Sequence, residues 1–232
     1  MASIELVSRI NNDEYTEYVY NQYDIQNRET VITSIPMMDW DKLPLDFNIL
    51  LILGNSGSGK STILRLLGDN TNKIELDYDK SIISQFPHKS PEEVAELFCG
   101  IGLCSVPTWL KKPNELSNGE RARFDIAAQI AFAKEGSLIC IDEFTSVVNR
   151  PCAQSMSYAL QRYIREHKLI VAIASCHYDI VEWLQPDYIY DLNKQENGMC
   201  EMQKLIYTDD KEYKSYKMVN EKEILSDARN ID

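Results

Sequence analysis

The chain has 232 residues, of which 44% are hydrophobic and 26% are charged, a composition typical of a soluble globular protein with room for one large domain. Its formal net charge of −12 argues against broad binding to nucleic acid or anionic membranes, because phosphate contacts depend on Lys and Arg. The six cysteines form no CxxC pair, so no zinc site is expected. The N-terminus lacks a secretion-signal pattern, and no apolar run is long enough to span a bilayer. We therefore expect a cytoplasmic protein with no membrane segment of its own.

After a polar, tyrosine-rich N-terminus, hydrophobic patterning predicts strands that alternate with helices. The predicted strands are residues 30–35, 47–53, 80–86, 137–144 and 168–177. The predicted helices are residues 60–68, 90–112, 117–134, 152–167 and 179–184, and a strand, a turn and a strand follow over 187–205. This alternation predicts an α/β fold with a mostly parallel core sheet. We expect residues 1–210 to form a single domain and residues 211–232 to form a charged C-terminal tail.

A glycine-rich stretch follows the predicted strand 47–53. It reads GNSGSGKST and fits the pattern GxxxxGK[ST] between an apolar strand and a helix, the context that supports this phosphate-binding motif. Its glycines let the backbone curl so that successive N–H groups form an anion nest, and the helix N-terminus adds its dipole. Lys60 would reach the β- and γ-phosphates, and Ser61 would be a ligand of Mg²⁺. The predicted nucleotide-binding residues here are Gly54, Asn55, Ser56, Gly57, Ser58, Gly59, Lys60, Ser61 and Thr62.

A second motif, LICIDE at residues 138–143, ends in two acids after four apolar residues. An apolar strand with this ending places a carboxylate at the C-terminal edge of the sheet, where ligands bind in open α/β folds. Asp142 would hold Mg²⁺ through water, and Glu143 would orient or deprotonate an attacking water. These two motifs leave small-molecule kinases, helicases, GTPases and transport ATPases open. No guanine-reading NKxD motif is present, because the NK at 193–194 has no aspartate two residues later.

A short polar segment ahead of the second motif decides between these classes. Residues 116–120 read LSNGE, and here the sequence resembles the ATP-binding cassette (ABC) ATPases, whose signature is LSGGQ. The Leu, the Ser and the second Gly are kept, whereas Asn118 and Glu120 depart from the signature. Asn tolerates left-handed backbone geometry, and Glu keeps the size of Gln while adding a charge. Ser117 followed three residues later by Glu120 also fits a helix N-cap with its capping box.

Three further segments follow the order of the motifs in that family. Gln85, at the end of a predicted strand, matches the glutamine that reaches Mg²⁺ and the water. Residues 142–149, DEFTSVVN, resemble the usual DEPTSALD, with Phe in place of Pro and Asn149 in place of Asp. His177 matches the histidine that contacts the γ-phosphate. The resemblance covers about residues 47–205.

The resemblance implies a P-loop NTPase of ABC type, with an antiparallel β part and a small helical subdomain at about residues 87–134. It implies a head-to-tail homodimer in which each ATP lies between the glycine-rich stretch of one copy and the signature of the other. The signature residues expected to contact ATP are Ser117, Asn118, Gly119 and Glu120. The expected Mg²⁺ ligands are Ser61, Gln85 and Asp142, and the expected catalytic residues are Glu143, His177 and Gln85. Candidates for the aromatic residue that stacks on adenine are Trp40 and Tyr23.

Three functions remain open. The first is an ATP-hydrolysing ATPase whose dimer closes on ATP and acts on a soluble protein or nucleic-acid partner. In its favour, TSVVNR and SCHYDIVEWLQPD look like segments of soluble ABC ATPases from bacteriophages and mobile elements. The second is the ATP-binding subunit of an ABC transporter, although the segment between Gln85 and Leu116, which would dock on membrane domains, is short. The third is an ATP-gated interaction module in which hydrolysis is slow.

Overall fold

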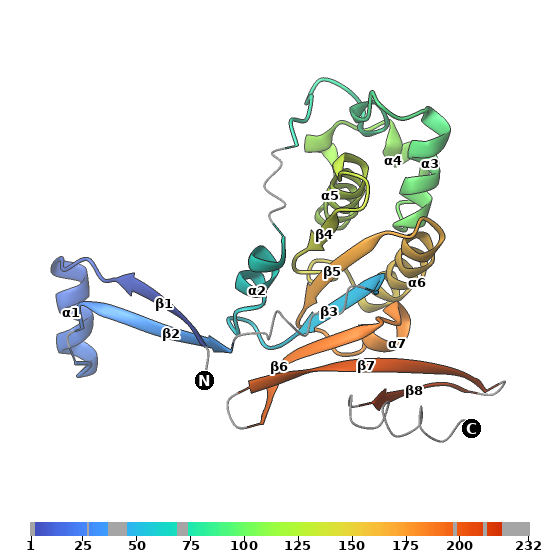
Figure 1. Ribbon diagram of the computed structural model, residues 1–232. Coiled ribbons are helices and arrows are strands. Elements are labelled where there is room, and N and C mark those ends of the chain that lie inside the picture. The colour runs from blue at the N-terminus through green and yellow to red at the C-terminus, as the bar shows by residue number, and fades with distance from the viewer. Residues whose placement is uncertain are drawn as a thin grey trace, which may run out of the picture.

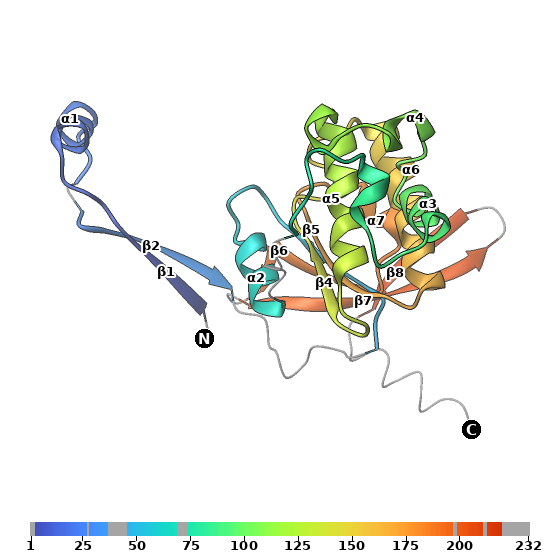
Figure 2. The same ribbon diagram turned by 90° about the horizontal axis from the view of Figure 1, so that it is seen from above.

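The computed structural model describes residues 3–26, 28–36, 46–68, 74–196, 199–210 and 213–219. A main body is built around one sheet, and an N-terminal arm stands apart from it (Figures 1 and 2). The strands of the body are β3 (Ile49–Leu53), β4 (Leu138–Ile141), β5 (Ile170–Ser175), β6 (Tyr188–Glu196), β7 (Met199–Asp210) and β8 (Tyr213–Val219). The helices of the body are α2 (Lys60–Leu67), α3 (Pro91–Gly100), α4 (Val106–Trp109), α5 (Asn118–Phe132), α6 (Arg150–Glu166) and α7 (Ile180–Leu184), with short 3₁₀ helices η2 (Ile82–Gln85) and η3 (Pro113–Glu115).

The sheet of the body has the strand order β4-β5-β3-β6-β7-β8 (Figure 1). The first four strands in this order run parallel, and β7 and β8 continue the sheet antiparallel. This arrangement confirms the predicted α/β fold with a mostly parallel core and an antiparallel β part. Because these four strands run parallel, their C-terminal ends meet at one edge of the sheet, and helices connect one strand to the next.

Alternate residues of β3 face two separate apolar clusters, as the two-residue period of a strand requires. Ile49, Leu51 and Leu53 join the cluster that also contains residues of α3, α5, α6 and α7. Leu50 and Ile52 join the second cluster, to which α2 contributes. Every β3 side chain is buried, because helices cover both faces of the strand. The continuous apolar run of β3 therefore reflects its place in the middle of the sheet.

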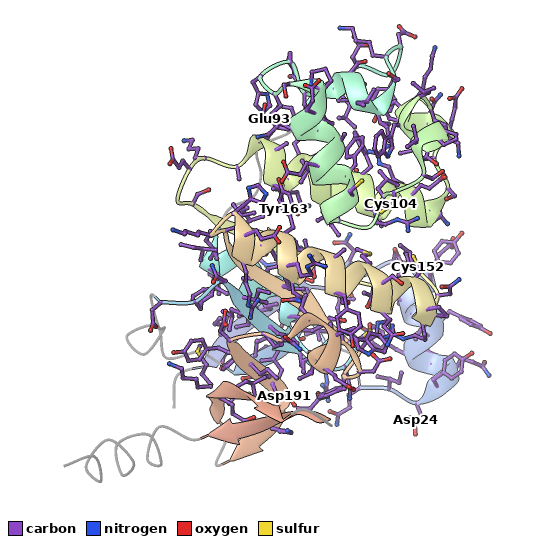
Figure 3. The ribbon with its side chains drawn as sticks, turned by 90° about the vertical axis from the view of Figure 1, so that its right-hand side faces the viewer. Asp24, Glu93, Cys104, Cys152, Tyr163 and Asp191 are labelled. Carbon is purple, nitrogen blue, oxygen red and sulfur yellow. The ribbon has the colours of Figure 1, made fainter. Side chains whose placement is uncertain are left out.

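The helices α3, α4 and α5 form the upper, helical part of the body in Figure 1. An aromatic group joins them, with the Phe98 ring 5.8 Å from that of Trp109 and 6.3 Å from that of Phe124. The α3 helix also packs closely on α6, since a side chain at Gly100 would collide with the ring of Tyr163, which Figure 3 shows beneath α3. Burial at this contact raises the pKa of Tyr163 to about 12.

Two sequence predictions in this region are wrong. Residues 80–86 do not form a strand; they contain η2, whose Ile82 is buried and donates its N–H to the carbonyl of Lys111 at 2.8 Å. The helix predicted over 90–112 is two helices, α3 and α4. Gly102 separates them with φ +79°, in a close approach to Met156 of α6. Of the expected tail 211–232, residues 213–219 form β8 in the sheet of the body, and the other tail residues lie outside the described ranges.

The N-terminal arm consists of β1 (Ser3–Arg9), α1 (Glu14–Tyr23) and β2 (Thr30–Pro36), with β1 and β2 paired as a separate antiparallel sheet. Figure 2 shows the arm extending away from the body. None of the residues of α1 is buried. Among the arm side chains that the structure describes, Ile35 is the buried one, and it packs against Gly59 at the start of α2. Ile4 is partly buried against the second apolar cluster, so the arm is anchored next to the glycine-rich stretch and is mostly exposed elsewhere.

Candidate nucleotide-binding site

The glycine-rich loop connects β3 to α2 and is shaped by its glycines. Gly57 and Gly59 have backbone φ angles of +79° and +98°, which residues other than glycine rarely adopt, and Gly59 is the N-cap of α2. A side chain at Gly54 would lie 2.5 Å from the hydroxyl of Ser58 and 3.1 Å from Leu192, so the loop closes tightly at its start. The result is a curled loop at the C-terminal edge of the sheet, which we call the cradle (residues 54–62).

The cradle has the charge and the donors that a polyphosphate requires. The ammonium group of Lys60 lies inside the loop, where it donates to the carbonyl oxygens of Gly54 at 2.8 Å and Asn55 at 2.7 Å. The first N–H groups of α2 have no acceptor within the helix, and they leave a partial positive charge at its start. The hydroxyl of Ser58 is buried without a hydrogen-bond partner. These features fit an anionic ligand, and Ser61 in the first turn of α2 adds an oxygen suited to Mg²⁺.

The two acids after β4 lie in a loop that is held firmly to β5. Both side chains are exposed, and the carboxylate of Asp142 accepts the backbone N–H of Glu143 at 2.9 Å. Glu143 has φ +50°, a left-handed conformation that non-glycine residues adopt at a cost of about 1 kcal/mol. Phe144 is buried and donates its N–H to the carbonyl of Ala174 at 2.9 Å, a bond that a proline at this position could not make. The loop thus keeps both carboxylates at the edge of the sheet.

His177 follows β5 and contacts the same loop. The ring nitrogen Nδ1 lies 3.1 Å from the hydroxyl of Thr145, whose side chain is buried. The backbone N–H of His177 donates to the hydroxyl of Ser175 at 3.1 Å, and that hydroxyl donates to the carbonyl of Phe144 at 3.0 Å. These bonds connect the histidine to the segment that contains Asp142 and Glu143. Thr145 is not among the predicted site residues, because the sequence around a threonine does not indicate its hydrogen-bond partner.

Gln85 lies in η2 and its amide is bonded to a nearby turn. Its oxygen accepts the N–H of Asp77 at 2.9 Å, and its nitrogen donates to the carbonyls of Asp77, Lys80 and Ser81 at 2.8, 3.1 and 3.2 Å. The side chain is buried, with 7% of its surface exposed. In this arrangement Gln85 holds the turn 77–81 together. Its predicted role as a ligand of Mg²⁺ stays a prediction and would require these bonds to open.

A chain of side chains that sequence reasoning missed supports the start of the cradle. Asn55 and Asn193 bond each other twice, since Asn193 Oδ1 accepts the N–H of Asn55 at 3.3 Å and its Nδ2 donates to Asn55 Oδ1 at 3.0 Å. Asn193 Nδ2 also lies 3.0 Å from the hydroxyl of Tyr178, which donates to buried Asp191 at 2.7 Å. Burial, with the bond to Asp191, raises the pKa of Tyr178 to about 12. The cradle is thereby connected to β6 and to the residue after His177.

The signature residues form the exposed start of α5. Ser117 is the N-cap, with its hydroxyl accepting the N–H of Glu120 at 3.4 Å, and the carboxylate of Glu120 accepts the N–H of Ser117 at 2.8 Å. This confirms the capping box predicted from the sequence. The side chains of Ser117 and Asn118 are exposed, and Gly119 lies near Val148, whose Cγ1 would be 3.3 Å from an added side chain.

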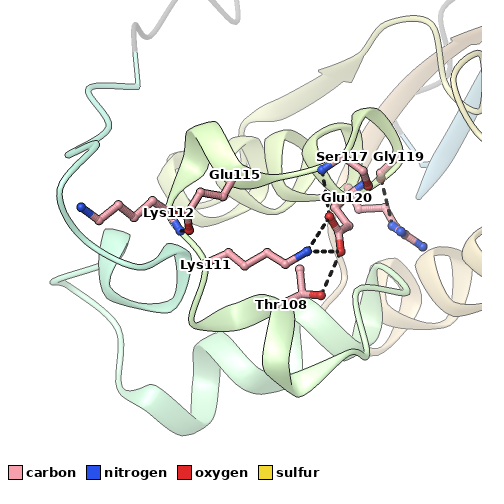
Figure 4. A network of polar contacts seen from close by, with 8 residues as sticks. Thr108, Lys111, Lys112, Glu115, Ser117, Gly119 and Glu120 are labelled. Atoms are coloured by element: carbon pink, nitrogen blue, oxygen red, sulfur yellow. Dashed lines mark hydrogen bonds and ion pairs between the residues drawn. The ribbon is translucent and has the colours of Figure 1, made fainter.

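Glu120 also belongs to a polar network with the segment before it (Figure 4). Its carboxylate accepts from the hydroxyl of Thr108 at 3.0 Å and from the ammonium group of Lys111 at 3.0 and 3.1 Å. The backbone N–H of Ser117, followed by Lys111, lowers the pKa of Glu120 to about 2. The signature glutamate is therefore a fully ionised and fully bonded group.

The segment after Glu143 connects the acids to α6. Asn149 is the N-cap of α6, and its side chain accepts the N–H of Cys152 at 2.9 Å. Asn caps helices as well as Asp, so the predicted departure at this position preserves the cap. A cavity of about 250 Å³ lies between α5, the end of β4 and residues 144–148, with Asp142 and Glu143 in its lining.

The adenine-stacking candidates gain no support. Tyr23 lies on the exposed arm, with 67% of its surface exposed, and Trp40 lies outside the described residues.

Within the ranges that the structure describes, no three His, Cys, Asp or Glu side chains are placed to hold a metal ion. Within those ranges, no helix is both long and apolar enough to cross a membrane.

We found no match to the chain among protein-family models or among curated proteins. Among solved structures the chain is similar to the cassette MJ0796, described as a bacterial ABC transporter cassette, in a dimeric structure with a TM-score of 0.54 and 16% identity. That match covers 77% of this chain and 93% of the other. A dimeric post-hydrolysis state of the same cassette, bound to ADP and Pi, matches with a TM-score of 0.53 and 15% identity, over 78% of this chain and 94% of the other. This chain therefore has the fold of an ATP-binding cassette.

Proposed function

We propose that this protein is an ATPase that binds ATP and Mg²⁺ in the cradle, closes as a head-to-tail homodimer and acts on a soluble protein or nucleic-acid partner. One observation supports the proposal most strongly. A curled glycine loop with a lysine inside it, two acids at the edge of the same sheet, and an exposed, capped signature helix occur together on a cassette fold. Each part alone has other uses, but the combination serves phosphate binding from two sides.

In this proposal the cradle binds the phosphates of ATP through Lys60 and the N–H groups at the start of α2. Lys60 would exchange its present carbonyl partners for phosphate oxygens, which are stronger acceptors for an ammonium group. Ser61 and Asp142 would hold Mg²⁺, which neutralises charge on the phosphates when bound. Asn193 would support the start of the cradle through its two bonds to Asn55.

Glu143 is the residue we assign to the water. Its exposed carboxylate follows the metal-binding acid directly, and it would accept a proton from a water that attacks the γ-phosphate, releasing ADP and phosphate. His177 would contact the γ-phosphate, and its bond to Thr145 would hold the ring in one orientation.

The signature would act on the ATP of a second copy. Ser117 and Asn118 are exposed at the start of α5, and Figure 1 places this helix in a different part of the body from α2 and the cradle. The solved structures that the chain resembles are dimeric. We therefore propose that two copies bring each cradle opposite the signature of the other.

The variant Glu143→Gln tests this proposal. It keeps the cradle and the signature but removes the group that would accept the proton, so an ATP-bound dimer should accumulate. Light scattering with size-exclusion chromatography, in ATP and Mg²⁺, should give twice the mass of the monomer, and ADP should give the monomer. Monomer alone under both conditions would refute dimer closure. Adding Ser117→Arg should leave ATP binding by the monomer intact and prevent closure.

The exposed arm supports the proposal of a further partner. Tyr15, Tyr18, Val19 and Tyr23 follow helical spacing along α1 and expose 74%, 62%, 41% and 67% of their surface. In the arm sheet, Val7 lies opposite Ile32 and both side chains are 59% exposed. Contiguous exposed apolar side chains mark interaction surfaces. Affinity capture with the Glu143→Gln protein and ATP, compared with its Tyr15→Ser/Tyr18→Ser form, would identify partners that use the arm.

A transporter subunit is the second candidate, favoured by the description of MJ0796 as a transporter cassette. The two candidates differ in their partner, because a transporter subunit must bind a polytopic membrane protein. Recovery of such a protein with this chain from detergent-solubilised native membranes would support the transporter role. Recovery of a soluble protein or nucleic acid that depends on ATP would support the first.

A further inference from the structure

Glu120 places a negative charge at an unfavourable position for the proposed function. It lies in the first turn of α5, beside Ser117, and this helix start would face the γ-phosphate of ATP bound by the other copy. A carboxylate here would repel the phosphate, whereas the glutamine of the LSGGQ signature is neutral. Other groups must therefore compensate for the charge of Glu120 if the start of α5 is to bind ATP.

The contacts of Glu120 provide the compensation. Both carboxylate oxygens are occupied: one accepts from Thr108 and Lys111, and the other accepts from Lys111 and from the backbone N–H of Ser117. Figure 4 shows the carboxylate directed toward Thr108 and Lys111. The Glu120 side chain is 18% exposed and the Lys111 side chain is 40% exposed, so the carboxylate is partly shielded from solvent while its cation reaches the surface.

Lys111 is held in place by the backbone around it. Its N–H donates to the carbonyl of Thr108 at 3.1 Å, and its carbonyl accepts the N–H of Ile82 at 2.8 Å. The neighbouring Lys112 is used differently, since its ammonium group lies 3.8 Å from Asp79 and its N–H donates to Glu115. The two adjacent lysines therefore provide a test residue and its control: Lys111 forms an ion pair with Glu120, and Lys112 does not.

We propose that Lys111 is a positioning residue that neutralises Glu120, so that the start of α5 can accept the γ-phosphate of ATP held by a second copy of the chain. This inference rests on the proposed dimer closure and assigns a role in it to a residue outside the LSNGE segment. The charge on Lys111 is the essential property. Removing that charge should weaken closure, and removing the charge on Glu120 as well should restore it.

The test uses the full chain with Glu143→Gln, in ATP and Mg²⁺, and measures the dimer dissociation constant by analytical ultracentrifugation. Lys111→Met should raise this constant about tenfold, because the dimer contains the pair twice. Lys112→Met should leave it unchanged. Adding Glu120→Gln to Lys111→Met should return it to the parent value. Lys111→Arg, which keeps the charge, should dimerise like the parent and provides a second test should the methionine variant fail to fold.

Two further measurements separate charge from packing. The affinity of the monomer for a fluorescent ATP analogue should be the same in all variants, since Lys111 would act only across the interface. High salt should reduce the defect of Lys111→Met, because screening weakens the repulsion that the variant exposes.

Unchanged closure in Lys111→Met would overturn the inference while leaving the proposed function intact. A defect that Glu120→Gln does not correct would also overturn it, because the loss would then come from the fold of the 108–112 segment. If the Glu143→Gln parent itself stays monomeric in ATP, the dimer proposal and this inference both fail.

Discussion

The hydroxyl of Thr145 lies 3.1 Å from Nδ1 of His177, and this contact joins the loop of the two acids to the segment after β5. Thr145 has φ +68°, an uncommon conformation for a β-branched residue, so the surrounding fold holds it there. A backbone held in such a conformation fixes where the Thr145 hydroxyl lies, and this hydroxyl gives the His177 ring a defined orientation. The contact leads to a prediction about turnover.

Thr145→Val should lower the ATP turnover number between about 10- and 100-fold, because the histidine ring loses the group that orients it. ATP affinity should stay unchanged, since Thr145 does not belong to the cradle. Thr145→Ser keeps the hydroxyl and should retain most of the activity. A steady-state phosphate-release assay separates the two variants, and equal turnover in both would show that this contact does not orient His177 for the reaction.

Lys60→Ala should weaken ATP binding about 10- to 100-fold, because an ammonium group bonded to phosphate contributes about 1.5–3 kcal/mol. Isothermal titration calorimetry with ATP and Mg²⁺ measures the change. Lys134→Ala, at an exposed position after α5, is the control and should bind like the parent. Unchanged affinity of Lys60→Ala would refute the assignment of the cradle.

Asn193→Ala should weaken ATP binding about three- to tenfold, since it removes both bonds that hold Asn55 and each of these exposed neutral bonds is worth about 0.5 kcal/mol. The same titration measures this effect, and Asn114→Ala, at an exposed position in the short 3₁₀ helix η3, serves as the control. An affinity equal to that of the parent would mean that the cradle keeps its shape without β6.

Phe144→Pro would introduce the residue usual in the resembled motif, yet it should lower the free energy of unfolding by about 3 kcal/mol or more. It removes a fully buried ring and the hydrogen bond from N–H to Ala174. Phe144→Leu keeps the N–H and most of the apolar volume and should cost less. Urea unfolding of the three proteins tests the order, and a stable proline variant would contradict the role given to this bond.

Glu120→Gln should change the acid stability of the protein. The pKa of Glu120 is lowered from 4.5 to about 2, chiefly by the N–H of Ser117 and then by Lys111, so the ionised group stabilises the fold above its ordinary pKa. That contribution disappears as the pH falls from 4.5 toward 2. The wild-type protein should therefore lose more stability than Glu120→Gln across this window in thermal unfolding followed by circular dichroism. Parallel pH curves would show that the carboxylate is not specially stabilised.

The parts of the site that sequence analysis located are local in the chain. The cradle spans nine consecutive residues between an apolar run and a helix, and the capping box of Ser117 and Glu120 spans four. Their geometry depends on glycines, helix ends and short-range bonds, which the order of the residues displays directly. The buried strands were recognisable for the same reason, because a continuous apolar run implies helices on both faces.

Two predicted elements, the strand 80–86 and the helix 90–112, are wrong because contacts with other parts of the fold oppose the local sequence pattern. Residues 80–86 have the composition of a strand, but Gln85 bonds the turn 77–81 and Ile82 bonds Lys111, so the segment folds as a 3₁₀ helix. The helix predicted over 90–112 stops before Gly102, where the chain turns against Met156. In both places contacts outside the segment outweigh its intrinsic preference.

The sequence by itself determined the fold class, the cradle, the paired acids and the capped signature helix, because each depends on neighbours along the chain. Only the tertiary structure decided which side chains support them: Asn193 on Asn55, 138 residues away in the chain, and Thr145 on His177, 32 residues away. It also decided that the charge of Glu120 is matched by Lys111. Periodicity and motifs carry no information about such pairs, since residues far apart in sequence meet only after the sheet has assembled.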